Sequence, residues 1–322
     1  MTIQFSSHLG EYTARVQYLV QRLEAEQVLR RIRQRDYTVW KPEPTEIVNR
    51  LGWLDIADRM LPAVPRLKAL AEGAMAAGCT QVVLLGMGGS SLAPEMFART
   101  LRRSGYPGLT VLDSTDPGAV LGRQARLEPE HTLFVVSTKS GGTVETLSLG
   151  KYFYTWMVEQ LGAKRAGQHF WAITDPGSSL VDWAQSLGFQ QILLADPNIG
   201  GRYSALSLFG LVPAALVGVD IERLLRSAVA AAEELGPGRP AADNPALLLG
   251  AAMGTLALAG RDKLSVFTSP ALASFGDWVE QLVAESLGKE GRGVVPVVGE
   301  LPARPAVFGA DRCFAALWLA RS

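Results

Sequence analysis

The sequence has few of the residues that build metal clusters or disulfide frameworks. It contains two cysteines, Cys79 and Cys313, and three histidines, His8, His131 and His169. The cysteines lack the spacing of a metal motif and the histidines are scattered, so we expect no metal site and no disulfide framework. Two cysteines without such a pattern are typical of a protein of the reducing cytoplasm.

An excess of one charge is also missing. Lys and Arg together number 31, as do Asp and Glu, and charged residues make up only 19% of the chain. Proteins that bind nucleic acids or anionic membranes usually carry a surplus of basic residues, so we expect neither partner. With 48% apolar residues, the composition is that of a globular protein.

No segment has the length of a membrane span or the order of a signal peptide. The longest apolar stretch, residues 206–219, is shorter than the about 20 residues that a helical span needs, and it contains Pro213. Residues 1–8 lack a basic region followed by an apolar core, so we expect a soluble, cytoplasmic protein. Apolar strands alternate with helices of about 10–15 residues, which predicts a parallel α/β architecture with room for about two domains.

A glycine cluster follows an apolar run of the predicted sheet. Val82–Leu85 has the composition of a strand, and Gly86-Met-Gly88-Gly89-Ser90-Ser91 leads from it into a helix-compatible stretch. Glycine lets the backbone approach a ligand closely, and the N–H groups at a helix start favour a phosphate. Gly88, Gly89 and Ser90 are therefore candidate phosphate-binding residues.

Two other interpretations of this cluster stay open from the residues alone. Gly86 and Gly88 match the start of a dinucleotide-binding fingerprint for a nicotinamide cofactor, and Asp113 follows the strand-like run 109–112. Ser91 occupies the third glycine position, however, so that fingerprint fails. The cluster can also be a purely structural turn between a strand and a helix.

A second loop, rich in hydroxyls, follows the apolar run Leu133–Ser137. Its residues are Thr138, Lys139, Ser140, Gly141, Gly142 and Thr143. The hydroxyls can donate to phosphate oxygens and Lys139 can supply a cation, although Thr143 can instead cap the following helix. Loops at the ends of two strands of one parallel sheet face a common crevice, so we expect both loops to serve one ligand.

Arg202 follows a glycine pair, Gly200-Gly201, and opens an apolar helix that we predict to run to about Val217. An arginine held near buried surface can stabilise a developing oxyanion with its fixed planar charge. An ordinary ion pair at a helix start is the alternative for this residue.

A helix predicted from about Ser274 to Leu287 carries Gln281 and Glu285. Residues four apart share one face of a helix, so these two can place an amide donor and a base beside one ligand. That pairing suits proton transfer on a small polar substrate. A solvated helix face is the alternative.

In their order along the chain, these four motifs resemble the signature motifs of the phosphoglucose isomerase family. The motifs are Gly86 to Ser90, Thr138 to Thr146, Gly200 to Ser204 and Gln281 to Lys289. Their spacing is most similar to the isomerase half of bacterial bifunctional transaldolase/phosphoglucose isomerases, and the resemblance runs from about Trp40 to the C-terminus. It implies an α/β fold with two sugar isomerase (SIS) domains, each a parallel sheet flanked by helices in three layers.

The resemblance implies an aldose-ketose isomerase that interconverts glucose 6-phosphate and fructose 6-phosphate through a cis-enediol, in glycolysis and gluconeogenesis. Glu285 is then the base, and Arg202 stabilises the enediolate. Substrate binding is implied for Gly88, Gly89, Ser90, Thr138, Lys139, Ser140, Gly141, Gly142, Thr143 and Gln281. The reaction needs no metal or redox cofactor, and the resemblance suggests a homodimer, with a transaldolase half supplied covalently or separately.

The same resemblance suggests how the chain is divided. We expect a helix over 10–35 and a linker within residues 1–44, a first SIS domain over 45–222, and a second over 223–322 that carries Glu285. The family's ring-opening histidine and C-terminal lysine lie beyond the glutamate motif, yet no His or Lys follows Lys289 here. We therefore expect a C-terminally truncated second domain.

Two further functions remain open. One is a noncatalytic module that binds sugar phosphates, and the other is an isomerase for another phosphosugar, such as mannose or heptose phosphate. The run Ser140-Gly-Gly-Thr143 is similar to simpler SIS-domain proteins, which leaves the substrate open. Glu285 and Arg202 favour an enzyme, because a sensor needs neither an enolising base nor an enediolate partner.

Overall fold

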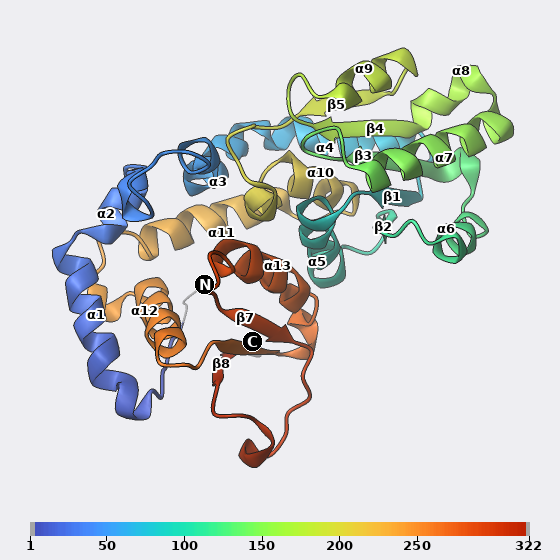
Figure 1. The fold of residues 1–322 in the computed structure, drawn as a ribbon. Helices are drawn as coiled ribbons and strands as arrows, with labels where there is room; N and C mark the ends of the chain where they lie inside the picture. Colours follow the sequence, from blue (N-terminus) through green and yellow to red (C-terminus); the bar gives the residue numbers. More distant parts are fainter. Residues whose placement is uncertain (1–3, 320–322) are drawn as a thin grey trace. The chain divides into compact units, whose positions relative to one another are not determined.

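The computed structural model describes residues 4–319 and divides the chain into two compact units (Figure 1). The five-strand unit consists of Asp55–Leu225. The three-strand unit combines the residues up to Leu54 with those from Arg226 onward. The segment before the first sheet therefore packs with the C-terminal part of the chain, and the division falls within α11 (Ile221–Glu234).

The five-strand unit is built on a parallel sheet in the order β2-β1-β3-β4-β5. Its strands are β1 (Gln81–Leu85), β2 (Gly108–Leu112), β3 (Thr132–Ser137), β4 (Phe170–Thr174) and β5 (Gln191–Leu194). The apolar runs predicted to be strands at 82–85, 109–112 and 133–137 are confirmed. Such continuous apolar runs are expected where helices bury both faces of a parallel sheet.

Helices cover both faces of this sheet. They are α3 (Ile56–Met60), α4 (Val64–Ala76), α5 (Leu92–Leu101), α6 (Pro117–Gln124), α7 (Val144–Leu161), α8 (Ala163–Ala166), α9 (Ser179–Ser186) and α10 (Leu208–Leu216). Val83, Phe134 and Phe170 share one core cluster with residues of α7 and α9. Alternate strand residues such as Val82 and Leu84, which are fully buried, point to the other face, where α10 contacts β1 and β4 and packs with α4 and α5.

The strand order reverses between β1 and β3. β1 pairs with β2 on one side and with β3 on the other, so the connections leave this point in opposite directions. In open α/β sheets, ligands bind in the crevice outside the carboxyl ends of the strands at such a switch point. Both predicted phosphate loops follow these two strands directly, as the sequence predicts.

The three-strand unit contains a parallel sheet in the order β7-β6-β8. Its strands are β6 (Lys263–Thr268), β7 (Val295–Val298) and β8 (Arg312–Leu317). Besides most of α11, its α-helices are α1 (Thr13–Ala25), α2 (Val28–Arg33), α12 (Pro245–Leu258) and α13 (Phe275–Leu287). The buried side chains of Leu264 and Val266 pack with Val279 and Val283 of α13. The predicted helix at 274–287 is confirmed.

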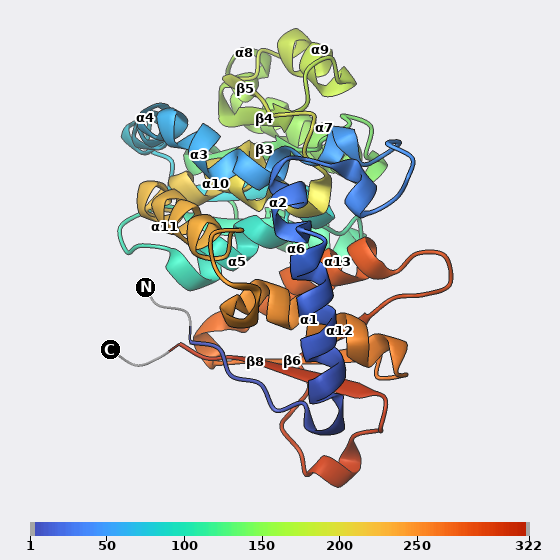
Figure 2. The same cartoon turned by 90° about the vertical axis from the view of Figure 1, so that its left-hand side faces the viewer.

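A second small core joins α1 to α12 within this unit (Figure 2). Val16 and Val20 pack against Leu247 and Ala251. Asn244 fixes the start of α12, because its side-chain oxygen accepts hydrogen bonds from the backbone N–H groups of the first turn. The N-terminal helix is thus anchored by apolar contacts and does not extend alone.

Two predicted helices are shorter than expected. The expectation of one helix over 10–35 is wrong, because Gln27 adopts a left-handed φ of 52° that ends α1 and starts α2. The expectation of a helix from Gly200 is also wrong. Residues Gly201–Leu206 form 3₁₀ turns (η9), and α10 begins only at Leu208, after an extended Ser207 whose hydroxyl accepts from Phe209 N.

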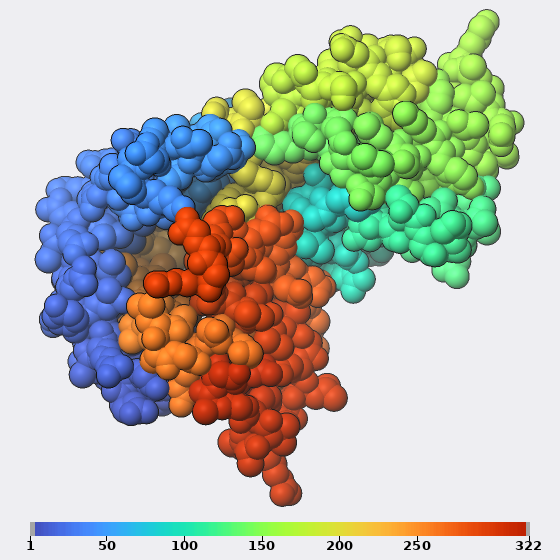
Figure 3. Space-filling model, viewed as in Figure 1, coloured from blue at the N-terminus to red at the C-terminus, as the bar shows by residue number. Residues whose placement is uncertain are grey.

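The three-strand unit leaves aromatic side chains exposed. Phe267, Phe308 and Phe314 contact one another, and Phe314 is 51% exposed. The connection between β7 and β8, which includes η12 (Pro305–Val307), projects from the surface (Figure 3). Within residues 4–319, none of the helices combines the length and the apolar character that a membrane crossing requires.

Candidate functional site

The loop after β1 leads into the start of α5 at the carboxyl edge of the sheet. Gly88 has a φ of +54° and opens a single 3₁₀ turn, η6 (Gly88–Ser90). The buried Ser91 stands at the N-cap position of α5 but makes no capping hydrogen bond there, because its hydroxyl donates to Gly88 O at 3.0 Å. The N–H groups of the first turn are therefore not capped by this side chain, which leaves the dipole end suited to an anion.

Gly89 is the point where two of the predicted motifs meet. A Cβ on this residue would lie 2.1 Å from Gly201 O, so only glycine fits. The buried Ser204 hydroxyl, which lies 2.6 Å from Gly201 O and 3.2 Å from Gly89 O, joins the same two segments. The segment that carries Arg202 is thereby packed onto the glycine loop, although the two are more than a hundred residues apart in sequence.

The loop after β3 is a compact, internally bonded turn. The Oγ1 atoms of Thr138 and Thr143 are 2.9 Å apart, and the Gly142 N–H donates to Ser140 Oγ at 3.2 Å. Gly141 has a φ of +70°, and a Cβ there would lie 2.8 Å from Ser178 Cβ. Thr143 occupies the N-cap position of α7, but its side chain makes no capping bond. The two threonine hydroxyls thus form a pair at the start of α7.

Two buried hydroxyls lie in the elements that flank this loop. Ser137 ends β3 and Thr146 belongs to the first turn of α7, and both residues have no exposed surface. Within the described chain, neither Ser137 Oγ nor Thr146 Oγ1 has a hydrogen-bond partner. Buried hydroxyls usually have a hydrogen-bond partner, so these two unsatisfied hydroxyls are an unusual feature of the region around the phosphate loop.

Lys139 is directed at the loops that follow β4 and β5. Its Nζ forms an ion pair with Asp175 Oδ2 and donates to Pro197 O at 3.0 Å. The two side chains are only 24% and 16% exposed. The ammonium that the sequence offers as a phosphate cation therefore already contacts a carboxylate and a carbonyl of the protein.

Arg202 is half-buried in η9 (Gly201–Leu206). Its guanidinium carbon lies 5.2 Å from the ring centroid of Tyr203, in the range of a cation–π contact. Because α10 begins at Leu208, Arg202 does not stand at the start of that helix, where the dipole disfavours a cation. Its charge instead lies within a turn that contacts the glycine loop.

The turn before Arg202 is held by a second ion pair that the sequence motifs do not reveal. Arg59 Nη1 donates to Asp196 Oδ2 at 2.6 Å, and the Asn198 N–H donates to Asp196 Oδ1 at 2.8 Å. Burial acts to raise the pKa of Asp196, but these hydrogen bonds outweigh it and hold the pKa below the usual value.

Asp175 and Asp196 could have been found from their spacing. Each follows the end of an apolar run and precedes a proline, in Thr174-Asp-Pro and Ala195-Asp-Pro. An Asp-Pro pair after a strand is typical of a turn at the carboxyl edge of a sheet. Arg59 gives no such signal, because only the fold brings it to Asp196.

Glu285 and Gln281 lie on one face of α13, as their spacing predicts. Gln281 Nε2 donates to Glu285 Oε1 at 2.8 Å. Glu285 is exposed, whereas Gln281 is half-buried, and its Oε1 is buried without a hydrogen-bond partner among the described residues. Both residues belong to the three-strand unit, and the other predicted site residues belong to the five-strand unit.

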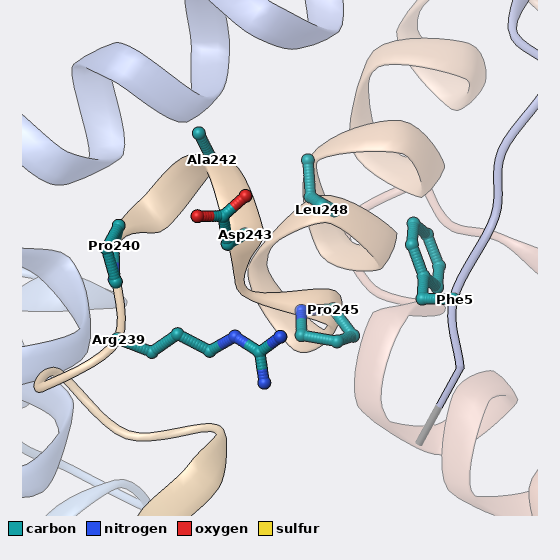
Figure 4. Close-up of a pocket in the computed structure, with 7 residues that line it drawn as sticks. All are labelled: Phe5, Arg239, Pro240, Ala242, Asp243, Pro245 and Leu248. Carbon is teal, nitrogen blue, oxygen red and sulfur yellow. The ribbon is translucent and has the colours of Figure 1, made fainter. Parts of the chain in front are cut away.

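A separate pocket of about 450 Å³ lies in the three-strand unit and contains none of the predicted site residues (Figure 4). It is lined by Phe5, Arg239, Pro240, Ala242, Asp243, Pro245 and Leu248. Arg239 also pairs with Glu234 at 2.9 Å. Among these lining residues, Asp243 is the one group that could act as a base.

Comparison with known sequences gives one consistent family. Residues 42–309 match the family model "Phosphoglucose isomerase". A glucose-6-phosphate isomerase of Rubrobacter xylanophilus is 35% identical over 238 residues, covering 70% of this chain and 54% of that protein. One from Carboxydothermus hydrogenoformans is 35% identical over 237 residues, covering 69% of this chain and 50% of that protein. The chain thus spans about half the length of these curated relatives.

Solved structures share the fold. A hypothetical protein from Thermus thermophilus has a TM-score of 0.75 at 27% identity, covering 89% of this chain and 68% of that chain. A glucose-6-phosphate isomerase from Chlamydia trachomatis has a TM-score of 0.72 at 22% identity, covering 88% and 60%. The two parallel sheets with their helices therefore match the fold of these two structures. By its sequence, this chain belongs to the phosphoglucose isomerase family.

Proposed function

We propose that this protein is an aldose-ketose isomerase that interconverts glucose 6-phosphate and fructose 6-phosphate through a cis-enediol. The observation that carries the proposal is the contact of Gly89 with Gly201, which brings the Arg202 segment onto a predicted phosphate loop at the switch point of the sheet. The relatives named glucose-6-phosphate isomerase support the substrate.

The phosphate is proposed to bind at the carboxyl ends of β1 and β3. Its ligands are the backbone at Gly88 and Gly89, Ser90, and the hydroxyls of the loop Thr138–Thr143. The uncapped starts of α5 and α7 add N–H donors and a favourable dipole. A phosphate held there positions the reacting carbons and supplies binding energy for catalysis.

The proton transfer is proposed for Glu285. As a carboxylate, it removes the proton from the carbon beside the carbonyl and returns it to the neighbouring carbon, with Gln281 as its hydrogen-bonding neighbour at 2.8 Å. Arg202 stabilises the negative charge that develops on the enediolate oxygen. A positioned base contributes about 10²–10⁴ in rate.

From the sequence resemblance we also propose a role in glycolysis and gluconeogenesis, a homodimer, a transaldolase as protein partner, and the cytoplasm as compartment. Cys79 and Cys313 are free thiols, which suits a reducing compartment. Burial raises the pKa of Cys79 to about 11, so this thiol is not a candidate nucleophile.

The test is a substrate panel. Isomerisation is measured with glucose 6-phosphate, fructose 6-phosphate and mannose 6-phosphate, and binding of each is compared with unphosphorylated glucose by calorimetry. Hydrogen bonds to a charged group contribute about 1.5–3 kcal/mol each, so two of them predict that glucose binds at least about 100-fold more weakly than its phosphate.

Variants locate the phosphate in the same experiment. Thr138→Val and Thr143→Val are each expected to weaken sugar-phosphate binding about tenfold, while the exposed Ser186→Ala in the same unit leaves it unchanged. Binding without turnover of any of the three substrates would favour the noncatalytic module. Turnover of mannose 6-phosphate and fructose 6-phosphate but not of glucose 6-phosphate would change the substrate, and equal binding of glucose and its phosphate would contradict the proposal.

A further inference from the structure

Lys139 lies in the predicted phosphate loop, but its contacts lead away from it. An ammonium has three N–H donors, and here two of its contacts are Asp175 Oδ2 and Pro197 O. A phosphate at the loop would have to compete for this lysine with a carboxylate that is only 16% exposed. The pair also carries no net charge, so its attraction for a dianion is weak.

The contacts of Lys139 cross from one strand end to two others. Asp175 follows β4 and Pro197 follows β5, and the backbone of Lys139 is tied to the same edge because Asp175 N–H donates to Lys139 O at 3.1 Å. Removing one member of a half-buried ion pair destabilises the fold, because the remaining charge loses the contact that offsets its burial. We therefore expect this pair to fix the position of both side chains.

The loop after β5 in turn determines where Arg202 lies. Asp196 is held by Arg59, Pro197 O is held by Lys139, and a few residues later Gly201 O reaches the position that only a glycine at 89 allows. The loops after β1, β3, β4 and β5 are therefore connected through these contacts, and the side chain of Lys139 makes two of them.

We propose that Lys139 is a positioning residue and not a phosphate ligand: through Asp175 and Pro197 it fixes the loop 195–201, and through that loop it holds Arg202 against the glycine turn. The inference deepens the proposed function and rests on it for the role of Arg202. A misplacement of about 1 Å can cost about 100-fold in rate, so loss of this support affects turnover more than phosphate binding.

Variants of Lys139 and Asp175 distinguish a positioning role of Lys139 from direct binding of phosphate by this lysine. If Lys139 were a direct ligand, Lys139→Met would weaken phosphate binding, whereas Asp175→Asn would release the lysine and strengthen it. If Lys139 is a positioning residue, both variants act in the same direction. Their double variant is then no worse than Lys139→Met alone, because that variant already removes the contacts of the lysine with both Asp175 and Pro197.

The primary measurement is backbone hydrogen exchange of residues 195–204 by mass spectrometry, which needs no activity. Lys139→Met and Asp175→Asn are each expected to speed exchange in this segment by about tenfold or more, with the exposed Lys151→Met as the matched control. Unchanged exchange in both variants would overturn the inference, and Asp175→Asn supplies the test if Lys139→Met fails to fold.

Calorimetry with inorganic phosphate and steady-state kinetics complete the test. We expect kcat to fall by about 10–100-fold in both variants while the phosphate Kd changes by less than about threefold. A phosphate Kd raised more than about tenfold by Lys139→Met and lowered by Asp175→Asn would show a direct ligand and contradict the inference. A wild-type protein that binds neither phosphate nor glucose 6-phosphate would refute the proposed function, whereas the exchange result would still decide whether Lys139 holds the loop.

Discussion

The two units differ in how completely their sheets are covered. In the five-strand unit, every residue of β3 and β4 is buried, and Phe134 stacks on Phe153 and Phe170 with ring centroids 4.9 Å apart. In the three-strand unit, β7 and β8 contain no fully buried residue, and Phe314 is 51% exposed. The proposed phosphate loops thus extend from a closely packed sheet, and the proposed base belongs to a unit with much less burial.

This contrast suggests a division of tasks. A phosphate site needs several donors held at fixed positions, and strand ends in a buried sheet provide that rigidity. The proton transfer needs one carboxylate on one helix, and the Gln281 side chain donates a hydrogen bond to it at 2.8 Å. We therefore expect substitutions in the five-strand core to cost more stability than equivalent ones in the three-strand unit.

The largest expected effect on stability is that of Phe153→Ala. This side chain has no exposed surface and belongs to the core between α7 and the sheet, so its removal is expected to lower the free energy of unfolding by about 3–5 kcal/mol. Phe314→Ala, the matched change in the other unit, is expected to cost less than about 1 kcal/mol because the ring is half-exposed. Urea unfolding of both variants measures the difference, and equal losses would remove the contrast.

The next effect is that of Gly89→Ala. The added Cβ would meet Gly201 O at 2.1 Å, so one of the two backbones must move, which is expected to cost about 1–3 kcal/mol and to weaken sugar-phosphate binding. Gly122→Ala is the control, since nothing lies within 4 Å of that site in α6, and a small gain in stability of about 0.5–1 kcal/mol is expected. Thermal unfolding with and without phosphate checks both. A Gly89→Ala protein with normal stability and binding would show that the contact between the two motifs is dispensable.

The smallest effect concerns acid stability. The pKa of Asp196 is held below its usual value of 3.8, so its stabilisation is fully present above that pH and is lost as the pH falls through the lower pKa of the folded state. Asp196→Asn is expected to cost less than about 1 kcal/mol at pH 7, and the difference from wild type should shrink below pH 4. Asp182→Asn, at an exposed position of α9, is the control.

The three-strand unit offers a parallel case for the same measurement. Hydrogen bonds from Thr38 and Arg31 lower the pKa of Asp36 from 3.8 to about 2. Its contribution is therefore lost mainly between about pH 4 and pH 2, and Asp36→Asn should remove that part of the pH dependence. A stability difference that stays constant with pH in either Asp variant would contradict the assigned hydrogen bonds.

Much of the site region could be predicted from the sequence because its signals are local. Continuous apolar runs that end in glycine or hydroxyl clusters identify β1 and β3 with their loops, and the spacing of Gln281 and Glu285 gives their shared helix face. Parallel sheets make such inferences possible, because every strand end lies at the same edge.

The parts that the sequence did not predict depend on contacts between distant segments. The lysine of the phosphate loop has a sequence neighbourhood that suggests an anion, yet the fold supplies Asp175 as its partner. The sequence predicts too early a start for α10, because the glycine pair and the apolar run are continuous in sequence. In the structure, the Gly89 contact and the extended Ser207 keep residues 201–206 in 3₁₀ turns. Gln27 ends α1 although neither Gly nor Pro marks the position.

The most direct test of the central claim is exchange of the C2 proton of glucose 6-phosphate in heavy water, for wild type, Glu285→Gln and the control Glu280→Gln from the same helix. We predict exchange and isomerisation in wild type and in the control, a loss of about 10²–10⁴-fold in Glu285→Gln, and unchanged binding of the sugar phosphate in all three. Exchange at the wild-type rate in Glu285→Gln would contradict the account, because the base would then lie elsewhere.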